Sequence, residues 1–126
     1  MPSSKNVVSS PEDFDSDLFA QAAIALKVAP DLNGSGARPH DHRKGQLILS
    51  LHGAVSCEVQ NALWLVPPQH AVWIPGGTPH SCRVTENART CFLFVEPGAA
   101  AMPEECCTVA ITPLVREMIL HLAEQE

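Results

Sequence analysis

The chain has 126 residues, which is enough for one domain with its own core and too few for two. Its 8 basic and 14 acidic residues give a net charge of −6, and such a surface repels phosphate backbones, so this segment is not expected to contact DNA by itself. Apolar residues make up 45% of the chain, but no run approaches the roughly 18 apolar residues of a membrane span, so we expect no membrane partner.

The N-terminal part of the chain divides at about residue 17. Residues 1–17 are polar and lack the basic-then-apolar plan of a secretory signal, so we expect a flexible lead-in there. In residues 18–30 the alanine and leucine content favours a helix. A first strand from Ala22 onward, leading into the turn residues before Gly34, fits the same letters, and we predict this strand.

Short apolar runs dominate residues 45–95. They recur about every ten residues between glycine, proline and asparagine, which is typical of an antiparallel sandwich or barrel. In the first run, Gln46 and Ile48 share one face while Leu47 and Leu49 share the other, so we expect a strand that is covered on both sides. We therefore predict an all-β barrel over residues 18–111. The runs are GQLILSL, AVSCEV, LWLV, AVWI, HSCRV and RTCFLFV.

The C-terminal part changes character. Residues 108–111 predict a last short strand, and Thr112 with Pro113 predicts a helix start, because threonine is a good N-cap and proline suits the first helical position. Residues 112–126 are expected to begin this helix, whose apolar stripe either packs on the barrel or pairs with its twin in a homodimer; the two arrangements are compatible. The stripe consists of Leu114, Val115, Met118, Ile119 and Leu122.

Three histidines and one glutamine carry the strongest chemical signal. His40, His42 and Gln46 have the same parity and project together from extended chain, and His80 follows a Pro-Gly-Gly turn that can direct it back towards them. Three imidazoles and an amide oxygen inside a small barrel would form a divalent-metal or polar-ligand site. The alternative is that these histidines are polar barrel residues that bind water or an effector.

The same residues resemble the motifs of a known family. The run from Gly34 through His40, His42 and Gln46 to Gly53 resembles the first cupin motif, in which the fourth ligand is usually glutamate. Residues 75–80 resemble the core of the second motif, although Gln69 and Val84 stand where that motif has glycine and asparagine. More narrowly, about three quarters of the chain, and above all VPPQHAVWIPGGTPH, resembles the N-terminal sensor domain of AraC-type transcription regulators.

This resemblance implies a cupin barrel, a double-stranded β-helix or jelly roll, that senses a small-molecule effector and is followed by a C-terminal helix. It also implies a homodimer, and contact with DNA only through a helix-turn-helix domain that is not in this chain. The implied protein is a cytoplasmic regulator and not an enzyme.

Gln46 in place of glutamate decides what the site can do. A bound Zn²⁺, Ni²⁺ or Fe²⁺ would keep its full double charge, so the affinity for metal should fall while the attraction for a carboxylate ligand should rise. The site also lacks a general base, so no catalytic residue is expected. Two other functions remain open, namely a stand-alone metal-dependent cupin enzyme (a dioxygenase or isomerase) and a small-molecule binding or storage protein.

The remaining residues receive simpler interpretations. The five cysteines, an odd number without a CxxC pair, indicate buried reduced thiols in a cytoplasmic protein; a metal or redox pair at Cys106 and Cys107 is the alternative. Trp64 and Trp73 are expected to fill the core or an interface. A basic cluster beside the HxH motif is expected to be a solvated rim; it consists of Arg38, Arg43 and Lys44.

Overall fold

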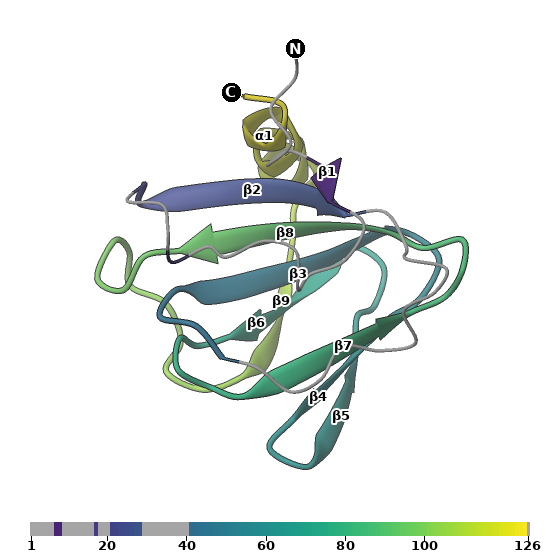
Figure 1. The fold of residues 1–126 in the computed structure, drawn as a ribbon. Helices are drawn as coiled ribbons and strands as arrows, with labels where there is room; N and C mark the ends of the chain where they lie inside the picture. Colours follow the sequence, from purple (N-terminus) through teal and green to yellow (C-terminus); the bar gives the residue numbers. More distant parts are fainter. Residues whose placement is uncertain (1–6, 9–16, 18–20, 29–40, 126) are drawn as a thin grey trace.

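The computed structural model describes residues 7–8, 17, 21–28 and 41–125, which form a β-sandwich with one helix (Figure 1). The strands are β1 (Val7–Val8), β2 (Ala23–Val28), β3 (Gly45–His52), β4 (Val55–Val59), β5 (Ala62–Leu65), β6 (His70–Ile74), β7 (His80–Val84), β8 (Arg89–Val95) and β9 (Cys107–Ala110), and the helix is α1 (Pro113–Ala123). Every apolar run predicted as a strand forms one, and the strand predicted from Ala22 onward is confirmed.

The strands form two sheets that face each other. The larger has the order β1-β2-β8-β3-β6-β9 and the smaller has the order β5-β4-β7. All strand pairs among the described residues are antiparallel except β1 with β2, in which Val7 and Val8 pair with Lys27 and Val28. The sequence did not predict β1, because two residues are too few for a pattern.

The two faces of the large sheet bury two separate cores. The first lies between the sheets and includes Ile48, Leu26 and Phe92, while the second lies between the large sheet and α1 and includes Leu47 and Leu49. The alternation predicted for β3 therefore holds along the strand. Fully burying a side chain of this size contributes roughly 1.5–3 kcal/mol, so the two cores together dominate the stability of the fold.

Helix α1 starts where the sequence predicts. Thr112 has an extended backbone, its hydroxyl oxygen accepts the Val115 N–H at 3.2 Å, and Pro113 follows at the first helical position. Only Ile119 and Ala123 of the helix are buried, and they belong to the core on the outer face of the large sheet. Figure 1 shows α1 next to β2. Among the described residues no helix is long and apolar enough to cross a membrane.

Candidate functional site

Gln46 lies at the centre of the site because β3 aims it into the space between the sheets. Its neighbours across the strand pairs are Ile74 on β6 and Phe94 on β8, and its side chain is only 2% exposed. His80 comes from the opposite sheet, as the first residue of β7. Like Gln46, His80 is 2% exposed. The sandwich thus brings one polar side chain from each sheet into a buried space. The sequence analysis expected Gln46 there from its parity and His80 from the Pro-Gly-Gly turn before it.

Two imidazoles flank the Gln46 amide. The Nε2 atom of His42 and the Nε2 atom of His80 each lie 3.1 Å from the Gln46 side-chain Oε1 position. The two rings meet edge to face, with their centroids 5.1 Å apart, and the His42 ring also contacts the Phe94 ring at 5.3 Å. The structure therefore brings together three of the four predicted site residues. The fourth, His40, lies outside the described residues.

The other ring nitrogen of each histidine is held by the backbone. His42 Nδ1 bonds the Lys44 carbonyl oxygen, and His80 Nδ1 bonds the Thr78 carbonyl oxygen at 2.8 Å. A carbonyl only accepts, so both Nδ1 atoms carry the hydrogen, and in the neutral rings both Nε2 atoms present a lone pair. An amide NH₂ group has two donors, and because the oxygen and nitrogen ends of an amide have the same shape, a Gln46 nitrogen at this point satisfies both rings.

The turn before β7 is tied to the segment that carries His42. Gly77 has a φ of +78°, which suits glycine, and its N–H donates to the His42 carbonyl oxygen at 2.7 Å. This bond joins two segments that lie 35 positions apart in the sequence. The Pro-Gly-Gly turn thus fixes where His80 starts relative to His42.

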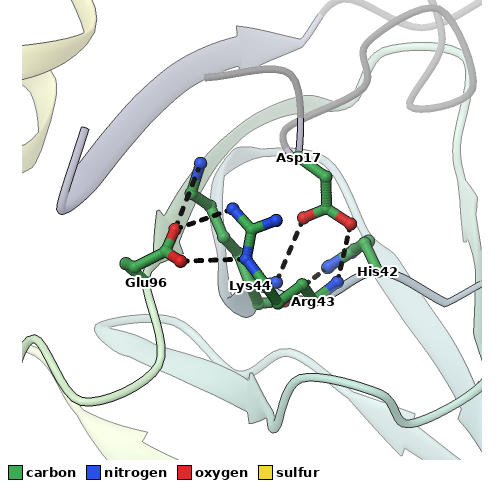
Figure 2. Close-up of polar contacts among 5 residues, drawn as sticks. All are labelled: Asp17, His42, Arg43, Lys44 and Glu96. Atoms are coloured by element: carbon green, nitrogen blue, oxygen red, sulfur yellow. Dashed lines mark hydrogen bonds and ion pairs between the residues drawn. The ribbon is translucent and has the colours of Figure 1, made fainter. Parts of the chain in front are cut away.

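A charged network holds the His42 segment on its other side (Figure 2). The Asp17 carboxylate accepts the backbone N–H groups of Arg43 at 2.8 Å and Lys44 at 3.3 Å. Arg43 donates two side-chain hydrogen bonds to Glu96, at 2.9 and 3.0 Å. The Lys44 ammonium lies 3.5 Å from the same carboxylate. The backbone at His42 is therefore anchored from the N-terminal segment and from the end of β8.

This network overturns the solvated-rim interpretation for Lys44 but not for Arg43, whose side chain is 49% exposed. The Lys44 side chain is fully buried and Arg43 is engaged by Glu96, while Arg38 lies outside the described residues. Long charged side chains are buried only where a partner compensates them, and the ion pair with Glu96 provides such a partner.

The network also changes the acidity of its two carboxyl groups. Partial burial alone would raise the pKa of Asp17, but the backbone N–H groups of Arg43 and Lys44, together with the Arg43 charge, outweigh it and lower the pKa below its ordinary value. The hydrogen bonds from Arg43 lower the pKa of Glu96. Both groups are therefore anionic at neutral pH.

The sequence did not reveal these supporting residues. Asp17 is separated from Arg43 by 26 positions, and Glu96 is separated from it by 53. Single-sequence patterns carry no signal for pairs so far apart. The Thr78 carbonyl orients His80. Any residue type would supply this carbonyl, so the identity of residue 78 gave no signal in the sequence.

The donor atoms present suit a divalent metal only in part. Two imidazole nitrogens oriented by backbone hydrogen bonds are a common metal-binding arrangement, and an amide oxygen can complete it weakly. Among the described residues, however, no group of three or more His, Cys, Asp or Glu side chains is placed to hold a metal ion. The described part of the site thus supplies at most three donors and no carboxylate.

A cleft of about 480 Å³ reaches the Thr78 end of the site. Its lining includes Trp64, Glu104, Glu105 and Cys106. The prediction that Trp73 fills the core is confirmed, because it is 4% exposed and donates its indole N–H to the Pro103 carbonyl at 2.8 Å. Trp64 is half-buried and faces this cleft.

The fold and the polar centre define a small jelly-roll binding domain, and comparison with known proteins identifies its family. Residues 28–122 match the AraC-like ligand binding domain family. The match spans well over half of the chain, so the chain belongs to this family. The HTH-type transcriptional regulator NimR of Escherichia coli (strain K12) is 54% identical over 112 residues, which is 89% of this chain and 41% of NimR. The chain thus spans less than half the length of this relative.

Solved structures share the fold at low identity. A Pseudomonas aeruginosa protein described as glyoxylate-induced has a TM-score of 0.50 and 17% identity, and the match covers 70% of this chain and 34% of that protein. An oxalate decarboxylase variant from Bacillus subtilis has a TM-score of 0.46 and 18% identity, with coverage of 63% and 22%. The predicted cupin barrel with a C-terminal helix is confirmed. Membership in a ligand-binding family, rather than among the cupin enzymes, agrees with the prediction of a non-enzyme.

Proposed function

We propose that this chain is the effector-sensing domain of an AraC-type transcription regulator. The observation that carries the proposal is the buried polar centre, in which two imidazoles face one amide inside a barrel of the ligand-binding family. Small-molecule sites are typically concave clefts with a few convergent polar groups, and here a cleft lined by Thr78 lies next to the segment that carries His80. Gln46 in place of a carboxylate removes one candidate general base from the described centre, which favours sensing over turnover.

The two polar rings and the amide set the kind of effector. Their pairing can be exchanged for hydrogen bonds to a ligand that carries its own donors and acceptors, at little net cost in buried polar groups. Native mass spectrometry of the chain purified from a bacterial host tests this directly. We expect a small molecule that is retained under native conditions, lost on denaturation and absent from a His80→Ala variant. Equal retention by that variant would place the ligand elsewhere.

We also propose that this centre is a binding site for a divalent metal, Zn²⁺, Ni²⁺ or Fe²⁺. The proposed ligands are His40, His42, Gln46 and His80. Support comes from the two Nε2 lone pairs that converge on the Gln46 amide. Equilibrium dialysis against each metal, followed by metal analysis, tests the idea. We expect His80→Ala to weaken binding by about tenfold or more, since ligand and support changes commonly cost 10–100-fold.

His70 provides a matched control for this experiment. Its Nδ1 bonds the Pro68 carbonyl at 2.7 Å, the same local arrangement that His80 has with Thr78, but it is half-buried on β6 and takes no part in the centre. His70→Ala should leave metal binding unchanged. No metal uptake by the unaltered chain would remove the metal from the proposal and leave effector sensing in place.

Helix α1 is proposed to pair with a second copy of the chain. The stripe residues Leu114 and Met118 are 71% and 61% exposed. Val115 and Leu122 are less exposed but line an apolar groove of about 620 Å³ between α1 and the large sheet. Residues spaced by four along a helix form one continuous face, and a second such helix is the simplest partner for it.

DNA contact is proposed to lie outside these 126 residues. The negative net charge opposes binding to a phosphate backbone, and the NimR relative, described as HTH-type, is more than twice as long as the matched part. The regulator would then work in the cytoplasm, where bacterial DNA lies. An electrophoretic mobility assay in which this chain alone shifts promoter DNA would contradict the proposal.

A further inference from the structure

Two buried cysteines lie opposite each other in the small sheet. Cys57 on β4 pairs in register with Cys82 on β7, and their Sγ atoms are 3.2 Å apart. Both are free thiols, and they are 0% and 7% exposed. Neither takes part in the His42–Gln46–His80 centre.

The backbone pattern shows which kind of strand pair they occupy. The Val66 N–H donates to the Val55 carbonyl, so Val55 turns its backbone polar groups towards β5. Because backbone direction repeats every two residues along a strand, the N–H and carbonyl groups of Cys57 also point towards β5. They therefore point away from Cys82 on β7. The bond from the Thr85 N–H to the Ala54 carbonyl supports this assignment, because it shows that Ala54, which is three positions from Cys57, points its backbone groups towards the β7 side.

Cys57 and Cys82 are therefore a non-hydrogen-bonded pair. In such pairs the Cα atoms are about 4.5 Å apart and the side chains approach most closely. Disulfides need a Cα separation of about 4.4–6.8 Å, so a bond can form here with little movement of the backbone.

We propose that Cys57 and Cys82 are a redox site that forms a reversible cross-strand disulfide with a small disulfide oxidant, RSSR. One thiol sulfur attacks RSSR, forming a mixed disulfide and releasing one RSH. The second thiol sulfur then attacks the protein sulfur of that mixed disulfide and releases the second RSH. The two cysteine protons pass to the two leaving thiolates, the protein loses two electrons, and RSSR gains them.

The geometry favours reversibility. The expected Cα separation lies at the short end of the disulfide range, and a strained disulfide is more easily reduced. Disulfides of this labile kind act as switches in reducing compartments, where relaxed structural ones are rare.

Access to the pair is controlled by the fold. The mutual hydrogen bond and burial raise the pKa of the Cys57 thiol, so the closed fold holds it protonated and slow to react. In the described part of the small sheet, however, β7 pairs only with β4 and forms its edge. Local lifting of this edge would expose both sulfurs together.

The bond would also reach the polar centre. His80 and Cys82 are two positions apart on β7 and point to the same face, and His80 pairs with Val59 as Cys82 pairs with Cys57. Shortening the sulfur separation draws β7 towards β4 beside His80. The His80 ring should then move relative to Gln46, whatever the centre binds.

The test is differential alkylation of the 126-residue chain before and after treatment with 2-hydroxyethyl disulfide, followed by peptide mapping. We expect a linked Cys57–Cys82 peptide pair that dithiothreitol reverses. The Cys91→Ala variant is the matched control, because Cys91 is also buried but belongs to the other core, and it should leave the link intact. Cys57→Ala should abolish the link.

Cys106 and Cys107 are half-exposed free thiols, and their oxidation is the competing reaction that would contradict the proposal. The proposal is wrong if Cys106 and Cys107 are oxidised while Cys57 and Cys82 are still alkylated as free thiols. It is also wrong if the mapped disulfide joins any other pair of cysteines. Both outcomes are measured on the unaltered chain, so they do not depend on whether a variant folds. NMR of the histidine rings supplies a second readout. Oxidation should shift the His80 signals and leave those of the exposed His121 in place, and an unmoved His80 would contradict the coupling.

Discussion

Gln46 can donate hydrogen bonds to both neighbouring imidazoles, whereas a glutamate at its position could pair with them only if the rings were protonated. Its amide offers two donors to two neutral imidazoles, whose other nitrogens already donate to the Lys44 and Thr78 carbonyls. A carboxylate would instead face two lone pairs, unless each ring took up a proton. With its nitrogen directed at the two rings, the glutamine satisfies both imidazoles without a metal.

The Gln46→Glu substitution tests this account. We expect it to tighten binding of Zn²⁺ or Ni²⁺ by about tenfold or more, because a gain of about 1.4 kcal/mol from the added negative charge is sufficient for that. Isothermal titration calorimetry measures the change. Gln125→Glu adds the same charge at an exposed position and should have no effect. Unchanged affinity in Gln46→Glu would mean that the amide does not face the metal position.

Asp17 provides a pH-dependent contribution to stability. Its pKa in the folded chain is lowered, so the folded state binds fewer protons than the unfolded state, whose value is about 3.9. The contribution is fully present above the unfolded pKa and is lost as the pH falls through the folded pKa. The free energy of unfolding of the wild type should therefore fall towards that of Asp17→Asn below about pH 4.

Urea unfolding of both proteins between about pH 6 and pH 3 measures this difference. Glu96 also has a lowered pKa, but it is present in both proteins and cancels in the comparison. A difference that stays constant over the range would show that the Asp17 carboxylate is not linked to folding.

The residues of the centre were predictable and their supports were not. The period of two in a strand and the Pro-Gly-Gly turn are local signals, and they brought Gln46 and His80 to the same space. The burial of Lys44 depends on Glu96, which lies at the end of another strand, and no local sequence pattern predicts such a pair. For this reason the sequence led to a solvated rim where the structure has a buried cation.

At the scale of elements, boundaries follow from local chemistry and pairing does not. Gln60 and Asn61 have φ values of 50° and 66°, which fit the two-residue turn that closes the β4–β5 hairpin. The pairing of β3 with β8 and of β6 with β9 joins strands far apart in the chain. Alternation predicts which face is buried but leaves open which strand will lie beside it.

The start of α1 allows a quantitative test at this scale. Thr112→Ala removes the oxygen that accepts the Val115 N–H, and we expect it to lower the free energy of unfolding by about 1 kcal/mol. Thr112→Ser keeps the oxygen and should restore most of the loss. Urea unfolding at one fixed protein concentration measures both variants, since association would otherwise shift the result. Equal loss in the serine variant would point to the threonine methyl group instead of the cap.

At the scale of the molecule, the two cores have different surroundings. The core between the sheets is closed on both sides. In the described part of the chain, the outer core is covered by Ile119 and Ala123 of α1, with partly buried residues such as Met102 and Ile111 packed against it.

Leu114 and Met118 are the most exposed residues of the apolar stripe, while Val115 and Leu122 line the groove between α1 and the large sheet. The sequence left open whether the stripe packs on the barrel or pairs with a twin; the structure shows that Ile119 packs on the barrel, and pairing with a twin stays a prediction. Buried residues of α1 hold it on β2 and β8, and its exposed apolar residues form the face that we propose pairs with a second copy.

The last prediction concerns that exposed face. If two copies associate through α1, Met118→Glu should place a charge in the centre of an apolar interface and weaken association by about tenfold or more, because an unpaired buried charge costs well over the 1.4 kcal/mol that a tenfold change requires. Sedimentation equilibrium measures the dimer constant. Leu63→Glu is the matched control, since Leu63 is 69% exposed on β5 and the change is the same in kind. Loss of the dimer in Leu63→Glu but not in Met118→Glu would move the interface from the helix to the small sheet.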